Sequence, residues 1–268
     1  MMRRLFVLLV VLVVLVAPDC FAEDSVVVNS IENSADSAAG DTVSSAAANT
    51  EEASVEAAVE SSEGNSVEAG SFDENEYIIY VPAGLEQGHK YPLIAAFSPS
   101  ADARGLIKTW GAHADRHKCI IMASKIIRNG MDIPNYLIQL RNIIHETIAQ
   151  QYPIMPDRII ALGTSGGGMA AHLFSFFHPD TVAAVITSVG YIHENSLKHK
   201  DTYPRDKVCA FLTSPTDFNY KLMKEDRKYL TKLDWRIKWY EFEGGHRTAP
   251  EDIREEALAW VIEQLNDS

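Results

Sequence analysis

The sequence predicts an α/β fold with a mostly parallel β-sheet covered by helices on both faces. From about residue 76 onward, short apolar runs alternate with longer segments of helical spacing, as strand–helix–strand units require. Most of the apolar runs are continuous rather than alternating, which is typical of strands buried on both faces. Residues 76–268 have the length of one ordinary domain, and no internal repeat is visible.

The first 22 residues have the pattern of a secretory signal peptide. Arg3 and Arg4 precede an apolar run of 13 residues, and Ala22 provides a small residue for cleavage. We therefore expect cleavage after Ala22, export to the periplasm or the outside of the cell, and no stable membrane insertion afterwards. The alternative is an uncleaved anchor, although the run is shorter than the roughly 20 residues of a spanning helix.

Residues 23–75 form a segment rich in Ser, Ala and Glu. Between Glu23 and Glu76 the chain has 14 acidic residues and no Lys or Arg, whereas residues 1–22 contribute +1 and residues 77–268 contribute 0, so the formal net charge of −13 arises from this segment. Low hydrophobicity and charge of one sign predict a disordered linker. The remainder of the chain is close to neutral, which argues against nucleic-acid binding, because such binding needs a basic face.

The strands of the domain at residues 76–268 are predicted from apolar runs. The first ends at Pro82, because proline has no N–H to donate to a neighbouring strand. The expected strands are Glu76–Val81, Leu93–Phe97, Cys119–Ala123, Ile159–Leu162, Val182–Val189, Val208–Thr213 and Arg236–Phe242.

The helices are predicted between these strands from apolar residues three or four apart. Leu137, Leu140, Ile144 and Ile148 follow this spacing and end before a proline, and Pro250 begins a final helix. The expected helices are residues 106–117, about 137–148, 166–177, 220–233 and the segment after Pro250.

The most informative motif is Gly163-Thr164-Ser165-Gly166-Gly167, which lies between a predicted strand and a predicted helix. A Gly-x-Ser-x-Gly motif in this context predicts a sharp turn that exposes the serine hydroxyl. Glycines leave out side chains where strand and helix pass close together. The free N–H groups at the start of the helix favour an oxyanion there.

Asp217 and His246 come shortly after the last two predicted strands, Val208–Thr213 and Arg236–Phe242 respectively. Functional groups collect at the carboxyl ends of such strands, so Ser165, Asp217 and His246 are predicted to form a catalytic triad. Taken singly, Asp217 is also compatible with a helix start, and His246 with an ordinary loop histidine.

The rival acids Glu241 and Glu243 fit the triad poorly, because they lie within or beside the last strand. An oxyanion hole needs two N–H donors. Gly166 is expected to supply one and the loop after Phe97 the other. Pro99 in that loop has no N–H, so the second donor is predicted to be Ser100 or Ser98, with Ser100 preferred.

These motifs resemble the compact α/β-hydrolase esterases, near the polyhydroxybutyrate-depolymerase-like and feruloyl-esterase-like group. The resemblance covers residues 76–268 and depends on Gly163–Gly167, Asp217–Asn219 and Phe242–His246. It implies hydrolysis of carboxylic esters through an acyl-enzyme, with no cofactor. The chain departs from many relatives at Ser98-Pro99, where they have His-Gly, and at Arg247, where they have an aromatic residue.

The expected function is therefore that of an exported serine esterase acting on a small or polymer-attached ester. The connection between Tyr191 and Asp206 is short and polar, so a minimal lid and an open site are expected, and the loop from Lys125 to Asn135 is predicted to form another wall. The alternatives are a serine peptidase of the prolyl-oligopeptidase type and a non-catalytic binding module. The sequence leaves the oligomeric state open.

Two further groups of residues are assigned structural roles. His113 and His117 have a spacing that suits zinc, but without a third ligand nearby they predict a solvated helix face and no metal. Cys119 and Cys209, each at the start of an apolar run, are expected to be buried free thiols.

Overall fold

The computed structural model describes residues 66–193, 196 and 202–267. The predicted signal peptide and nearly all of the predicted linker lie outside these residues. Within them, no helix is both long enough and apolar enough to cross a membrane.

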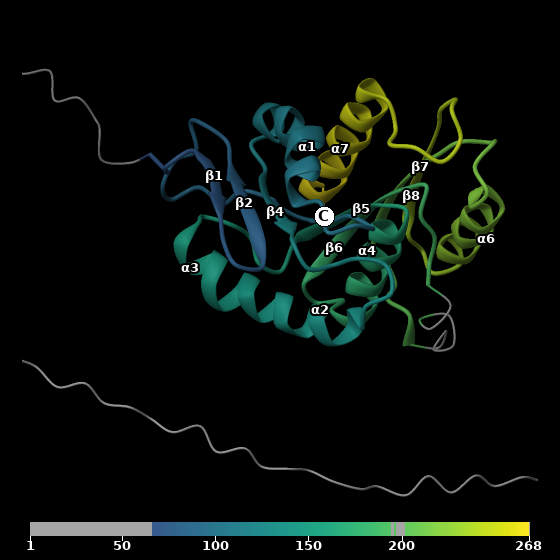
Figure 1. The fold of residues 1–268 in the computed structure, drawn as a ribbon, viewed down its shortest axis with the longest axis horizontal. Helices are drawn as coiled ribbons and strands as arrows, with labels where there is room; N and C mark the ends of the chain where they lie inside the picture. Colours follow the sequence, from purple (N-terminus) through teal and green to yellow (C-terminus); the bar gives the residue numbers. More distant parts are fainter. Residues whose placement is uncertain (1–65, 194–195, 197–201, 268) are drawn as a thin grey trace, which may run out of the picture. The chain divides into compact units, whose positions relative to one another are not determined.

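The described residues form an eight-stranded sheet with the order β1-β2-β4-β3-β5-β6-β7-β8 (Figure 1). β1 and β2 pair antiparallel, as do β2 and β4, and all other neighbours pair parallel. The strands are β1 (Gly70–Asp73), β2 (Tyr77–Val81), β3 (Leu93–Phe97), β4 (Ile120–Ser124), β5 (Ile159–Thr164), β6 (Val182–Ser188), β7 (Val208–Thr213) and β8 (Arg236–Glu241). The predicted mostly parallel sheet is confirmed.

Helices cover both faces of this sheet, as predicted. The helical elements are α1 (Ala103–His117), α2 (Ile133–Asn142), the π-helix η1 (Ile143–Ile148), α3 (Ala149–Gln151), α4 (Gly166–Phe177), α6 (Tyr220–Thr231) and α7 (Glu251–Asn266). α1 and α7 pack on one face, and α2, η1, α4 and α6 pack on the other (Figure 1). The helical spacing predicted through Ile148 is confirmed, with one π-helical stretch in place of a regular α-helix.

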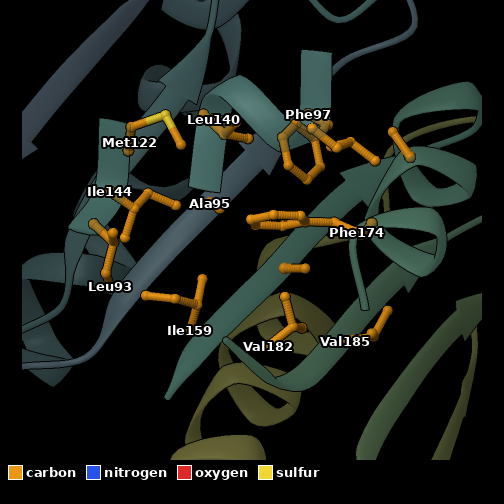
Figure 2. Packing of buried hydrophobic residues seen from close by; sticks show 14 of the residues in the cluster. Leu93, Ala95, Phe97, Met122, Leu140, Ile144, Ile159, Phe174, Val182 and Val185 are labelled. Carbon is orange, nitrogen blue, oxygen red and sulfur yellow. The ribbon is translucent and has the colours of Figure 1, made fainter. Parts of the chain in front are cut away.

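The core explains why the central strands are continuously apolar. In β3, Leu93, Ala95 and Phe97 point into the cluster under α2 and α4, whereas Ile94 and Ala96 point into the cluster under α1 and α7. Because successive side chains in a strand alternate between faces, a strand covered on both sides must be apolar throughout. Figure 2 shows the first cluster, in which Phe97 meets the ring of Phe174 edge-on at 6.0 Å.

The folded part begins earlier than the predicted boundary at residue 76. Val67 is buried, and β1 pairs with β2 at the edge of the sheet. Its sequence, Gly-Ser-Phe-Asp, is short and half polar because only alternate side chains are covered. The Asp73 carboxylate also binds Lys125 and Arg104, so part of the acidic segment belongs to the domain.

The prediction of a solvated face at His113 and His117 is wrong. His113 is buried, and its Nδ1 donates to Glu255 of α7 at 2.5 Å. His117 Nε2 donates to the other carboxylate oxygen at 2.7 Å, and Arg116 lies 2.8 Å from Glu255. The two histidines therefore join α1 to α7. In the described part of the chain, no group of three or more His, Cys, Asp or Glu side chains has the arrangement of a metal site.

Cys119 and Cys209 are both buried free cysteines, as expected. Burial raises the pKa of the Cys119 thiol to about 12, so it stays protonated at neutral pH. Both residues serve the core rather than the chemistry.

We expect Glu255→Gln to lower the free energy of unfolding by about 1–3 kcal/mol at pH 7, because partly buried donors lose a charged acceptor. Burial alone would raise the pKa of Glu255, but the hydrogen bonds from His113, Arg116 and His117 outweigh it and lower the pKa to about 2. A carboxyl group whose pKa is lowered by folding stabilises the fold at pH values above its ordinary pKa. This contribution disappears as the pH falls towards 2.

Urea unfolding at several pH values tests this expectation. The difference between wild type and Glu255→Gln should shrink as the pH falls from about 4.5. Glu263→Gln, a change at an exposed position of the same helix, is the control and should leave stability unchanged. Equal stability of wild type and Glu255→Gln at pH 7 would contradict the assignment.

Candidate active site

Ser165 occupies the strained turn between β5 and α4 that the sequence predicts. Its φ of +54° and ψ of −122° lie in a region that residues with a Cβ rarely adopt. The turn is held on both sides, because Ser165 N donates to Ser188 O at 2.8 Å and Met169 N donates to Ser165 O at 3.1 Å. The hydroxyl is thereby presented at the carboxyl edge of the sheet, as a nucleophile requires.

The glycines around Ser165 are required by close backbone contacts. A Cβ on Gly163 would lie 2.1 Å from Gly167 O, and a Cβ on Gly167 would lie 2.2 Å from Phe97 O and 2.9 Å from Ser98 N. Any side chain here would therefore push apart β5, α4 and the end of β3. Because these two positions have no side chains, the serine turn can lie against the loop after β3.

The structure brings all three predicted triad residues together. His246 Nε2 lies 2.8 Å from Ser165 Oγ, and His246 Nδ1 lies 2.6 Å from Asp217 Oδ2. We assign the tautomer in which Nδ1–H donates to the carboxylate and Nε2 accepts from the serine hydroxyl. The Asp217 side chain is fully buried and that of His246 is 28% exposed, so the carboxylate is shielded while the imidazole stays accessible.

The carboxylate of Asp217 is fixed by its own loop. Its second oxygen, Oδ1, accepts from Asn219 N at 2.6 Å, and Asn219 Nδ2 donates to Val189 O at 2.8 Å. The histidine loop is attached to the same region, because Gly245 N donates to Ser214 Oγ at 3.0 Å. These bonds connect the loops after β6, β7 and β8 and hold Asp217 and His246 in position relative to each other.

Phe218 covers one face of the histidine. Its ring is stacked on His246 with centroids 4.2 Å apart, and the side chain is nevertheless 74% exposed. An exposed large apolar side chain beside a polar site marks a contact surface. The rival acid Glu241 lies elsewhere, accepting from Tyr220 Oη and Trp239 Nε1.

The loop after β3 carries the two predicted second donors. Ser98 is buried beside Gly167, whereas Ser100 is exposed and its N–H donates to Ser98 Oγ at 3.3 Å. Ala101 follows with a φ of +58°, so this loop contains backbone strain as the serine turn does. The oxyanion roles of Gly166, Ser98 and Ser100 stay predictions.

The predicted lid region lies partly outside the described residues, but its start is anchored. Ile192 N donates to Asp226 Oδ2 of α6 at 2.7 Å, and Asp226 is buried. Burial raises the pKa of Asp226 to about 7, against the lowering effect of the Ile192 hydrogen bond. The chain after β6 is therefore tied to α6 before residue 194.

The sequence assigned no role to three residues of this site, two of which belong to the Asp217–Asn219 motif. Phe218 stacks on the histidine, Asn219 orients the acid, and the Asn129 side chain lies against Gly166. Asn219 is two residues from Asp217, an ordinary spacing for a side chain that folds back on a nearby amide. Asn129 belongs to the loop from Lys125 to Asn135, which was predicted to form a wall of the site, but no sequence pattern distinguished this residue from its neighbours.

Comparison with known proteins gives matches among solved structures alone. A scan of known protein families finds no match, and neither does a search of characterised proteins. The fluorophosphonate-binding serine hydrolase FphF of Staphylococcus aureus is 11% identical, with a TM-score of 0.55 over 74% of this chain and 98% of that one.

Two esterase structures give similar values. A carboxylesterase of Mesorhizobium loti is 13% identical, with a TM-score of 0.55 over 70% of this chain and 98% of that one. Esterase PE8 is 16% identical, with a TM-score of 0.55 over 69% of this chain and 96% of that one. At these sequence identities the likeness concerns the fold alone. It shows that the chain has the α/β-hydrolase fold, which the resemblance of its motifs predicts.

We expect Gly167→Ala to lower the free energy of unfolding by about 1–3 kcal/mol and to displace Ser165, because the added methyl group meets backbone atoms that cannot move independently. Chemical denaturation measures the first effect, and the rate of modification of Ser165 by a fluorophosphonate measures the second.

Gly111→Ala is the matched control for this change. Gly111 lies inside α1, and its added methyl group would meet Tyr80 at an ordinary 3.7 Å. This variant should keep both stability and reactivity. A Gly167→Ala protein that resembled the control in both measurements would show that the close packing is not needed.

Proposed function

We propose that this protein is an exported serine hydrolase that cleaves carboxylic esters through an acyl-enzyme on Ser165. The observation that carries the proposal is the continuous hydrogen-bonded chain from Ser165 through His246 to Asp217, at a turn with positive φ. A serine hydroxyl is a weak nucleophile until an adjacent base takes its proton. Here that base is in contact with the hydroxyl.

In the first half of the reaction, Ser165 Oγ attacks the ester carbonyl carbon while its proton passes to His246 Nε2. The carbonyl oxygen becomes an oxyanion, held by Gly166 N–H together with Ser100 or Ser98. Asp217 stabilises the imidazolium through Nδ1–H. The carbon–oxygen bond to the alcohol then breaks, and His246 gives its proton to the departing oxygen, which leaves an acyl group on Ser165.

In the second half, water replaces the alcohol. His246 takes a proton from the water as its oxygen attacks the acyl carbon, and a second oxyanion forms in the same place. Its collapse breaks the bond to Ser165 Oγ, which recovers the proton from His246, and the carboxylic acid leaves. All of these steps use groups of the chain and water.

The solved structures with this fold support an ester rather than a peptide substrate. Two of them are a carboxylesterase and an esterase. A serine peptidase is the competing assignment, since it would use the same three residues. Hydrolysis of a p-nitrophenyl ester compared with the matching p-nitroanilide distinguishes the two, and we expect turnover of the ester only.

We expect a fluorophosphonate to add once to the wild-type protein, on Ser165, and not at all to Ser165→Ala. Asp217→Asn should keep the fold but lower kcat by about 10⁴-fold, because the amide favours the wrong histidine tautomer. Intact mass, peptide mapping and p-nitrophenyl acetate hydrolysis provide the readouts. An unlabelled but folded wild-type protein would instead favour the non-catalytic binding module.

Export is a separate part of the proposal, motivated by the charged start, apolar run and small residues of the first 22 positions. We expect the mature protein recovered after secretion in a bacterial host to begin at Glu23. N-terminal sequencing and intact mass give the answer. A product that retained residues 1–22 in the membrane fraction would show an uncleaved anchor.

A further inference from the structure

Asn129 lies beside the nucleophile turn, although it belongs to the loop between β4 and α2. A Cβ built on Gly166 would lie 1.8 Å from Asn129 Oδ1, 2.9 Å from its Cγ and 3.4 Å from its Nδ2. The carboxamide therefore fills the space that a side chain at position 166 would occupy. This contact explains why position 166, directly after Ser165, is a glycine. The crossing of β5 and α4 does not itself require one there.

The position of Asn129 is set by the loop after β3, which carries the predicted oxyanion donors Ser98 and Ser100 and is called the oxyanion loop below. Asn129 N donates to Pro99 O at 2.9 Å, and the neighbouring Arg128 forms a β-bridge with Ser100. Gly130, with a φ of +82°, then turns the chain away. The backbone of residue 129 is thus attached to the same short loop that carries the second predicted oxyanion donor.

The side chain of Asn129 is exposed and free to act on a ligand. Its carboxamide makes no hydrogen bond to any residue in the described part of the chain, although its backbone does. The terminal torsion of asparagine is broad and roughly two-fold, so rotation exchanges the positions of Oδ1 and Nδ2 at little cost. Either orientation keeps an unused N–H donor next to Gly166.

We propose that Asn129 is a further catalytic residue whose Nδ2–H donates to the oxyanion of the acylation and deacylation intermediates. This inference rests on the proposed function. Pro99 removes one backbone donor from the oxyanion loop, and the Ser100 amide already donates to Ser98 Oγ. The Asn129 carboxamide adds a neutral donor from a third segment, next to the predicted Gly166 donor.

The test compares Asn129→Ala and Asn129→Asp with wild type, using p-nitrophenyl acetate and a fluorophosphonate as probes. Both variants should lower kcat and the rate of Ser165 labelling by about 10²-fold or more, the cost of losing one oxyanion donor. KM should change little, because the donor acts on charge that develops during the reaction. The near-isosteric Asn129→Asp keeps the side-chain volume if Asn129→Ala fails to fold.

A pH series separates a donor role from a structural role. The carboxylate of Asn129→Asp cannot donate at neutral pH, but its protonated form can. The rate of this variant relative to wild type should therefore rise as the pH falls towards the ordinary aspartate pKa of about 3.9. The charge-matched control Asn142→Asp changes an exposed residue at the end of α2 and should behave as wild type throughout.

The possible failures are distinguishable. If wild type itself neither reacts with the fluorophosphonate nor hydrolyses the ester, the proposed function fails and this inference fails with it. If wild type reacts and folded Asn129 variants react at the same rate, the proposed function stands and Asn129 is not an oxyanion donor. A loss of unfolding temperature without any change in rate would assign Asn129 a structural role only.

Discussion

The close approach of three backbone segments around Ser165 is the constraint on which the site depends. Gly163, Gly167 and the end of β3 come within distances that exclude a single methyl group. This packing holds Ser165 at positive φ, a conformation that costs of order 1–3 kcal/mol and persists only when its surroundings enforce it. The large apolar core under α2 and α4 holds these segments in place, because Phe97 at the end of β3 and Phe174 in α4 both pack in it (Figure 2).

The parallel sheet then determines where the other two members of the predicted triad lie. β5, β6, β7 and β8 are consecutive neighbours, so their carboxyl ends form one edge, and the loops after β7 and β8 face the serine. Hydrogen bonds within and between these loops hold the two side chains in place, since Asp217 accepts from Asn219 N in its own loop and Gly245 N donates to Ser214 Oγ across the two loops. The acid and base are thus positioned by backbone groups, which move less than side chains would.

Features that repeat along the chain could be predicted from the sequence, and features that depend on distant partners could not. Continuous apolar runs predicted the central strands, and the order Ser165, Asp217, His246 at strand ends predicted which side chains meet. β1 was missed because it is an edge strand of four residues, half of them polar, and so contains no continuous apolar run. The burial of His113 depends on Glu255 of α7, and no local spacing reveals a partner that far along the chain.

The loop after β3 shows why the fold predicts the triad better than it predicts the oxyanion hole. Triad positions follow from the sheet, but the donors come from loops whose conformation is set by one another. Pro99 illustrates this: it has no N–H to offer an oxyanion, yet its carbonyl accepts from the backbone N–H of Asn129, whose side chain lies beside Gly166. A residue that removes one backbone donor is thereby bonded to the segment that carries the proposed Asn129 donor, so the proposed oxyanion site depends on contacts between two loops rather than on the sheet.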